Sequence, residues 1–263
     1  MKITHLNPYF RAALVLMVTA VLLIVVAIVT DRRDLTSASL VISSLVCLLT
    51  GIFLLTLSGS DPLDLRYVSL LSVQDHINLC RICAELGFSG NACFIPAGRN
   101  GITKTMQYLP VSVYDGGPIP QNTLVTGPDN AGLLMVPSGD SLLKELRQHE
   151  NLVTPSDISS LKDLIKEVAI EVLEVAEKIT VTDTEDTITL QIEGYRLIAG
   201  CHALLQESPR CCALNPCPVC SIFACLIAEG TGRIIEMEHC SAIPKKDSVT
   251  AVFTFLALPD RNP

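Results

Sequence analysis

Two long apolar stretches open the chain and divide it. Residues 12–30 are uncharged and mostly apolar, and residues 35–58 form a second such stretch after a polar turn at residues 31–34. An α-helix rises about 1.5 Å per residue, so each stretch is long enough to cross a hydrocarbon core about 30 Å thick. We therefore expect a transmembrane helical hairpin over residues 1–60 and an extramembrane domain over residues 61–263.

Two other interpretations of these stretches fit less well. A cleaved signal peptide has a shorter apolar core and a small-residue cleavage site, and no clear site of that kind follows the first stretch. A buried helix pair in a soluble protein would need a large core around helices that are apolar on all sides. The lipid bilayer is therefore the first expected partner of the chain.

The basic residues near the stretches predict the orientation. A hairpin places both of its ends on one side of the membrane, and that side carries Lys2, Arg11 and Arg66 together with the α-amino group. The turn carries Arg32 and Arg33. Because Lys and Arg are enriched on the cytoplasmic side, the balance favours a multi-pass cell-membrane protein with a cytoplasmic C-terminal domain. The many cysteines also suit a reducing compartment.

Beyond residue 61, apolar residues recur with two different periods. Spacings of three and four predict helices, and alternation predicts strands. We expect helices over residues 72–86, 141–149, 155–178 and 219–229. We expect strands over residues 92–96, 104–113, 132–136, 180–184, 187–192, 233–240 and 248–256. This mixture predicts an α+β fold class: a helical hairpin followed by a mixed α/β domain.

Capping residues and glycines place the expected helix ends. Thr154 is the expected N-cap of the long helix, with Pro155 at its first position. Residues 138–140 are expected to cap the helix over 141–149, and Cys217 with Pro218 to open the helix over 219–229. Gly230 and Gly232 are the expected stop of that last helix. Residues 116–130 and 258–263 are expected to be loop and tail.

Charge argues against one class of partner. From residue 61 onward there are 15 Lys and Arg against 25 Asp and Glu, a balance of −10. Such a domain is repelled by phosphate backbones. Trp is absent and aromatic residues make up 5% of the chain, so no base-stacking platform is evident. Nucleic acid is therefore not an expected partner.

Residues 201–240 hold seven of the eleven cysteines and are the candidate site. A thiol at a helix N-terminus has a lowered pKa, which singles out Cys217 and, one turn on, Cys220. With Cys212 and Cys240 they form the predicted metal-ligand set, which suits zinc or an iron–sulfur cluster. His202 and His239 could add nitrogen donors. The alternative is that all of these thiols are structural and buried, as free cysteines commonly are.

Neither the other cysteine pair nor a known catalytic motif predicts a further site. Cys80 and Cys83 lie three residues apart in an expected helix, where we expect them to pack in the core. The sequence contains no GxSxG, Walker A, HExxH or strand-linked GxGxxG pattern. Enzymatic activity is therefore not predicted.

The C-terminal part resembles the vinyl-reductase-like domain family over residues 154–257. The resemblance is carried by Cys217-Pro218-Val219-Cys220, the small-residue helix that leads to Gly232, Glu238 and Cys240, and residues 252–255. It implies a small-ligand-binding or sensory module, in which some members handle tetrapyrrole-related molecules and some bind metal through cysteines. The whole layout is also similar to that of certain archaeal membrane proteins, a likeness that implies no function.

Three hypotheses follow. The first is a membrane-anchored, non-enzymatic protein whose cytoplasmic α+β domain binds a small ligand or a protein partner. The second is a metal- or thiol-dependent redox protein that uses Cys217 and Cys220, with Cys240 and Cys212 as further ligands. The third is a structural membrane-associated protein.

Overall fold

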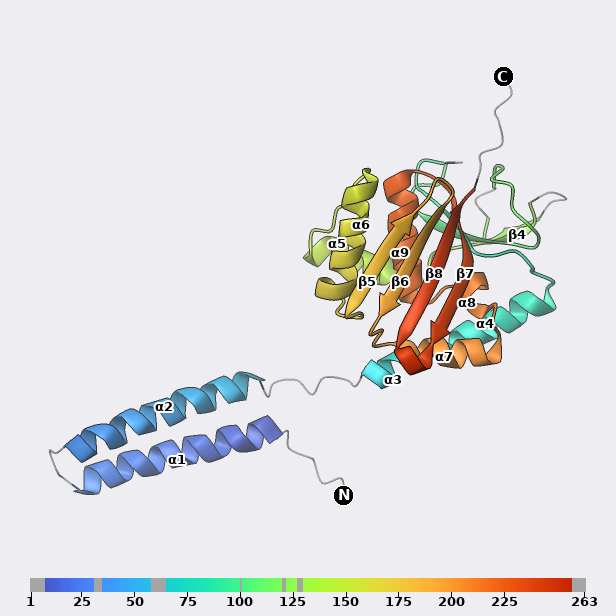
Figure 1. Cartoon of the computed structure of the whole chain (residues 1–263). Helices are drawn as coiled ribbons and strands as arrows, with labels where there is room; N and C mark the ends of the chain where they lie inside the picture. Colours follow the sequence, from blue (N-terminus) through green and yellow to red (C-terminus); the bar gives the residue numbers. More distant parts are fainter. Residues whose placement is uncertain are drawn as a thin grey trace. The chain divides into compact units, whose positions relative to one another are not determined.

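The computed structural model describes residues 8–30, 35–57, 65–99, 101–119, 122–126 and 130–256 (Figure 1). The chain forms two compact units, residues 1–63 and 64–263. The predicted turn at residues 31–34, Asn100 and the predicted tail at residues 258–263 lie outside the described residues.

The first unit is a pair of apolar helices, as the sequence predicts. α1 (Pro8–Thr30) and α2 (Leu35–Leu57) pack against each other through small residues. A Cβ atom added at Gly51 would lie 3.0 Å from the Met17 side chain and 3.3 Å from the Ala13 carbonyl, so glycine permits this close approach. Most of the large apolar side chains face outward. Both helices are long and apolar enough to cross a membrane.

The second unit is built on an eight-stranded sheet in which all neighbouring strands are antiparallel. The strand order is β3-β4-β2-β1-β7-β8-β6-β5. The strands are β1 (Cys93–Ile95), β2 (Met106–Pro110), β3 (Leu124–Val125), β4 (Gly132–Met135), β5 (Lys178–Asp183), β6 (Thr187–Glu193), β7 (Ile235–Ile243) and β8 (Ser248–Phe255). β1 pairs with β7, so the strands of the predicted module share one sheet with the strands that precede it. The α+β fold class is confirmed.

Helices cover this sheet and bury its main core. They are α3 (Leu65–Leu70), α4 (Val73–Glu85), α5 (Asp140–His149), α6 (Ile158–Glu167), α7 (Ile198–Glu207), α8 (Cys211–Leu214) and α9 (Pro218–Thr231). α9 contacts α5 and α6 as well as β1 and β7. Figure 1 shows α5, α6 and α9 on the same side of strands β5 to β8. The main core therefore fills the space between these helices and the sheet.

α9 is the central helix of the second unit, and its start is as predicted. Cys217 is its extended N-cap, Pro218 is at its first position, and Gly232 ends it with a φ of +62°. Gly230 does not stop the helix. It lies within α9, where an added Cβ would meet the Pro155 carbonyl at 2.7 Å. That glycine is needed for close packing rather than for termination.

The long helix is shorter than predicted at both ends. Its N-cap is Asp157, whose carboxylate accepts a hydrogen bond from the Ser160 N–H at 2.9 Å. The expected cap, Thr154, instead donates its hydroxyl to Glu229 at 3.3 Å. A π-turn (Val168–Val172) follows α6, and Glu174 then reverses the chain with a φ of 49°. The expected helix to residue 178 is therefore wrong, because the last apolar positions belong to a turn and to β5.

Several smaller expectations also need correction. Ser138 does not cap α5; Gly139 holds the N-cap position, and the Ser138 hydroxyl donates to the Pro216 carbonyl at 2.9 Å. The short helix α8, which carries Cys211 and Cys212, was not predicted. Nor were α3, α7 and β3, which are short or lack a capping signal.

Candidate functional site

Five cysteines lie together where α7, α8, the start of α9 and β7 meet. This inner thiol cluster consists of Cys201, Cys212, Cys217, Cys220 and Cys240. Hydrogen bonds join its thiols in a row, from Cys212 to Cys240, to Cys220, to Cys217 and to Cys201. The structure therefore brings together all four of the predicted ligands.

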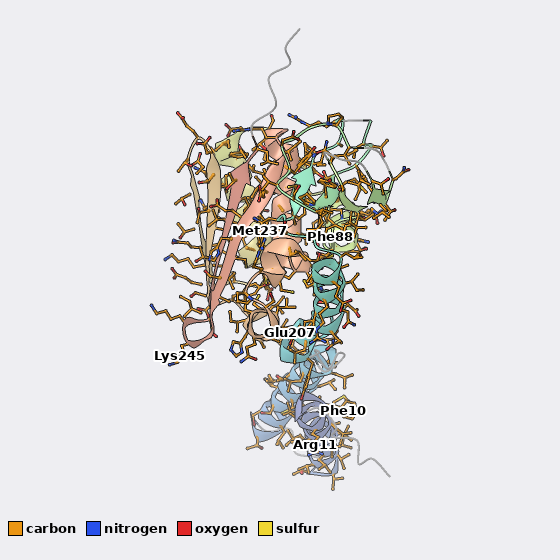
Figure 2. All side chains as sticks on the ribbon, turned by 90° about the vertical axis from the view of Figure 1, so that its right-hand side faces the viewer. Phe10, Arg11, Phe88, Glu207, Met237 and Lys245 are labelled. Atoms are coloured by element: carbon orange, nitrogen blue, oxygen red, sulfur yellow. The ribbon has the colours of Figure 1, made fainter. Side chains whose placement is uncertain are left out.

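A β-bulge is needed to bring Cys240 into the cluster. In a regular strand, residues three apart point to opposite faces. Met237 is fully buried within the sheet (Figure 2), so Cys240 would be expected to face away from it. The pairing shifts between Met237 and His239, so that Cys240 lies opposite Ala251 and is buried as well. The extra residue thus places both side chains on the core side.

Hydrogen bonding divides the cluster into donors and acceptors. The thiols of Cys201 and Cys220 donate to Cys217 and hold its pKa well below the usual range. Hydrogen bonds from Cys212 and Cys220 lower the pKa of Cys240 in the same way. Donation, together with burial, raises the pKa of the Cys212 thiol. Cys217 and Cys240 are therefore the two positions at which the cluster favours thiolate.

Positive charge and a phenol support the Cys217 thiolate. His76 lies close enough for its charge to favour the thiolate, and its ring also contacts the Ser72 carbonyl at 3.0 Å and the Pro216 carbonyl at 3.3 Å. Tyr195 is almost fully buried, and burial followed by the charge of Cys217 raises its pKa. Its hydroxyl is hydrogen-bonded to Cys217. His76 and Tyr195 therefore form the polar side of the site next to Cys217.

The two histidines predicted as nitrogen donors lie outside the row of thiols, and one cysteine that was not predicted lies within it. His202 is exposed on α7 and His239 is exposed on β7, although the charge of His239 lowers the pKa of Cys240. Cys201 was not among the predicted ligands. Its signal was helical spacing: in α7 it lies three residues before Leu204, and both are buried. Cys225, deeper in α9, is buried in the core and takes no part in the row.

A metal ion needs suitable donor atoms that are arranged around it. Four thiolates suit zinc or an iron–sulfur cluster chemically. Within the described ranges, however, no three His, Cys, Asp or Glu side chains are grouped to hold a metal ion. The thiols form a row rather than surrounding a centre. Zinc or iron–sulfur binding therefore stays a prediction.

An apolar cavity of about 190 Å³ lies against one end of the row. It is enclosed by α3, the start of α4, α5, α7 and the start of α9. The cavity lining consists of Val68, Ser69, Ser72, Val73, Leu142, Tyr195, Leu197, Gly200, Cys201, Leu204, Cys217, Pro218 and Val219. No Asp, Glu, Lys or Arg is among these lining residues. Its polar groups are hydroxyls and the two thiols that the cavity shares with the inner cluster.

A glycine sets the distance between two walls of the cavity. An added Cβ at Gly200 would lie 2.3 Å from the carbonyl oxygen of Ser69. Such a contact is far inside the van der Waals limit, so any larger residue would push α3 and α7 apart. The backbone of α3 therefore closes directly on α7 beside the cavity.

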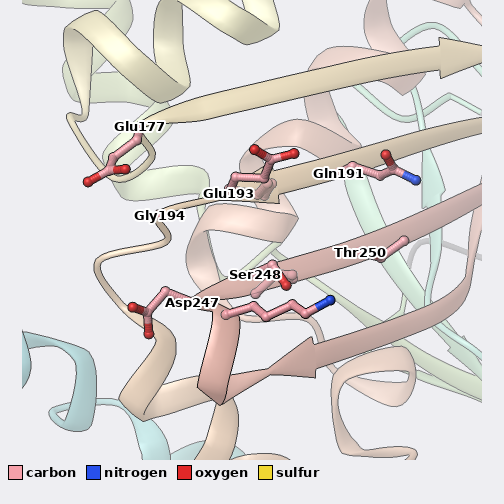
Figure 3. Close-up of a pocket in the computed structure, with 10 residues that line it drawn as sticks. Glu177, Gln191, Glu193, Gly194, Asp247, Ser248 and Thr250 are labelled. Carbon is pink, nitrogen blue, oxygen red and sulfur yellow. The ribbon is translucent and has the colours of Figure 1, made fainter.

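A larger hollow of about 530 Å³ lies where β5 begins and β6 ends, beside the turn that leads from β7 into β8 (Figure 3). Its side chains are mostly polar and project from the strands and connections, with Glu177 and Asp247 on different connections. Lys178 approaches Glu193 at 3.4 Å on the same surface. No buried polar group is directed into this hollow among those described. It is an open surface, so the smaller cavity is the better candidate site.

The two units define a class of protein before any comparison: paired apolar helices joined to an antiparallel α+β domain with a thiol-walled cavity. The chain belongs to the family described as "Domain of unknown function (DUF7982)", whose pattern matches residues 4–254. No curated protein matches the chain, and no solved structure matches it.

Proposed function

We propose that this protein is anchored in the cell membrane by α1 and α2 and binds a small, mainly apolar ligand in the cavity beside Cys201 and Cys217. Two helices of membrane-spanning length and composition support the anchoring. The distribution of Lys and Arg supports a cytoplasmic position for the α+β domain. The binding role is non-enzymatic.

The cavity itself carries the proposal. Ligand sites are concave and mostly apolar, with a few polar groups that fix orientation. Here the polar groups are the Tyr195 hydroxyl and the thiols of Cys201 and Cys217. An engineered apolar cavity of about 150 Å³ is large enough for benzene, so a volume of about 190 Å³ suits a ligand of similar size. The absence of charged lining residues favours an uncharged molecule.

Benzene is a suitable probe of the cavity. The full chain in detergent micelles is heated with a maleimide dye that becomes fluorescent when buried thiols are exposed. A ligand that binds only the folded state raises the melting temperature by mass action. We expect saturating benzene to raise the melting temperature of the natural chain by a few degrees.

Three variants separate binding from effects of benzene on the micelle. Val73→Phe places a ring into the cavity, and Leu142→Phe does so from its more exposed rim. Val153→Phe is the matched control, because Val153 is 79% exposed and lies outside the cavity lining. Benzene should no longer stabilise the two cavity variants and should still stabilise the control. Equal shifts in all four chains would contradict the proposal.

The row of thiols favours a second candidate function, which is binding of a soft metal ion. Cys212, Cys217, Cys220 and Cys240 would be the ligands, and two of them already favour the thiolate form. A bound zinc ion would fix α8, α9 and β7 relative to one another. A bound iron–sulfur cluster would supply one-electron transfer.

Metal analysis of the full chain, purified without oxygen or chelators, tests this second function. One equivalent of zinc or a stoichiometric amount of iron is expected if the cluster is a metal centre. Cys220→Ala should then lose the metal. Cys225→Ala, which removes a buried thiol of the same helix outside the row, should keep it. Substoichiometric metal in the natural chain would exclude this function.

A further inference from the structure

Two cysteines outside the inner cluster approach each other closely. Cys80 on α4 and Cys211 on α8 form the outer thiol pair, with their sulfur atoms 2.6 Å apart. This separation is only about 0.5 Å longer than the ~2.05 Å of a disulfide bond. Cys80 also lies 3.6 Å from the Cys211 carbonyl oxygen. Cys83, which lies three residues from Cys80 on the same helix, packs in a small core cluster with Leu109 and Leu214.

The outer thiol pair borders a hollow, and one of its two members is partly exposed. It lines a hollow of about 150 Å³ together with Ala84, Phe88, Ser208, Arg210 and Leu214. Cys80 is partly exposed, whereas Cys83 is almost fully buried. Among the cysteines of α4, the one beside Cys211 is therefore the one open to solution chemistry.

The electrostatics of the outer thiol pair make its two members unequal. Hydrogen bonding with Cys80 lowers the pKa of Cys211. The same bond, followed by burial, raises the pKa of Cys80. The negative charge of Glu207 opposes ionisation of Cys211, and the ion pair of Glu207 with Arg81 lies close by. The close approach of the two sulfur atoms allows a mixed disulfide on either cysteine to be resolved by the other.

We propose that Cys80 and Cys211 are a modification site that forms a disulfide by exchange with low-molecular-weight disulfides. One cysteine of the pair, as its thiolate, attacks one sulfur of the reagent, and the other sulfur leaves as a thiolate with the bonding electron pair. The second cysteine then gives up its proton to solvent and attacks the modified sulfur of the first, which releases the second reagent thiolate. Two protein thiols are oxidised, and one reagent disulfide is reduced to two thiols.

The proposed disulfide would act next to the inner cluster. It would join α4 to α8, and α8 also carries Cys212, the first thiol of the row. Oxidation would therefore fix the short helix from which Cys212 reaches Cys240. This inference rests on the outer pair alone and stands whether or not the cavity binds a ligand.

Mass spectrometry of the full chain in micelles tests the proposal. The reduced protein is treated with bis(2-hydroxyethyl) disulfide, quenched in acid, alkylated under denaturing conditions and digested. We expect a linked peptide that contains Cys80 and Cys211, and a loss of two of the eleven thiols. Neither the Cys80→Ser nor the Cys211→Ser variant should form the linked peptide, and each should lose at most one thiol, to a mixed disulfide.

Cys83→Ser is the matched control. Cys83 lies three residues from Cys80 on the same helix. Among the described hydrogen bonds, Cys211 pairs with Cys80 and not with Cys83. It should form the linked peptide as the natural chain does. A dominant link between Cys80 and Cys83, or between Cys211 and Cys212, would overturn the proposal. So would retention of all eleven thiols after treatment that oxidises a small dithiol of comparable pKa.

Discussion

Cys211 and Cys212 are neighbours in the sequence, yet they belong to different groups of thiols. Cys211 meets Cys80 of α4, whereas Cys212 donates to Cys240 of β7. Consecutive residues of a helix point about 100° apart, so one short helix can present two thiols to two different neighbours. Cys80 of the outer thiol pair and Cys217 of the inner thiol cluster are partly exposed, and the other members of both groups are buried. The number of cysteines in a stretch of sequence therefore does not show how many separate sites these cysteines form.

The largest effect is expected from removing the packing on which the inner thiol cluster depends. Phe223 of α9 is 0% exposed, and truncation of such a side chain costs about 3–5 kcal/mol of unfolding free energy. Phe223→Ala should therefore lower the melting temperature strongly and expose the inner thiols to alkylation. Phe53→Ala in α2, where the ring is 64% exposed, should leave the melting of the α+β domain unchanged. Equal effects of the two variants would contradict the described core.

Deletions at the β-bulge should show how Cys240 reaches the inner thiol cluster. Removal of Glu238 alone leaves Met237 and Cys240 two residues apart, so a regular strand keeps both side chains on the core side. Removal of Glu238 together with His239 makes them consecutive and turns Cys240 to the opposite face. We expect Cys240 to become alkylated in the native chain only in the double deletion, while Cys80 keeps its reactivity. Peptide mass spectrometry after brief alkylation measures both. Continued protection of Cys240 in the double deletion would mean that strand alternation does not position it.

Removing the thiol of Cys212, but not that of its neighbour Cys211, should change the pKa of Cys240. Cys212→Ala removes the main hydrogen bond that lowers the pKa of Cys240. The Cys240 pKa should therefore rise, and its reaction with a small neutral alkylating reagent should need a higher pH. Cys211→Ala should leave the Cys240 pH profile in place. A shift with Cys211→Ala as large as that with Cys212→Ala would show that the two groups are one.

The smallest effect is expected at the surface of the outer thiol pair. Glu207 pairs with Arg81, with side chains 40% and 62% exposed, and such surface pairs contribute about 0–1 kcal/mol. Glu207→Gln should therefore change stability little. It removes a negative charge that raises the Cys211 pKa, so disulfide exchange below the pKa of Cys211 should be modestly faster. Glu193→Gln, whose partner is Lys178, should not change the exchange rate.

Periodicity was sufficient for most of the fold and for the opening of α9. The pair of apolar helices, most of the strands and the Cys217–Pro218 helix start all follow from local patterns. The long helix was overextended because Val175 and Ile179 continue an apolar spacing of three and four across a π-turn and into a strand. Local patterns do not show where the backbone leaves a helix when both conformations bury the same residues.

The candidate site was only partly predictable for a related reason. Cys217 and Cys220 carry a local signal, the helix N-terminus, but Cys201 reaches the cluster only because α7 packs against β7. Cys240 needs a bulge that no local pattern marks. The contact between Cys80 and Cys211 joins residues 131 positions apart. Such contacts depend on tertiary packing, so the sequence pattern could suggest the participants without assigning partners.

Residue-by-residue alkylation of the native full chain, with and without benzene, is the most direct test of the thiol-walled cavity. The cavity is shared by Cys201 and Cys217, whereas Cys80 lies in a different hollow. We predict that saturating benzene slows alkylation of Cys201 and Cys217 and leaves the rate at Cys80 unchanged. Equal slowing at all three cysteines, or no slowing at Cys217, would contradict ligand binding in this cavity.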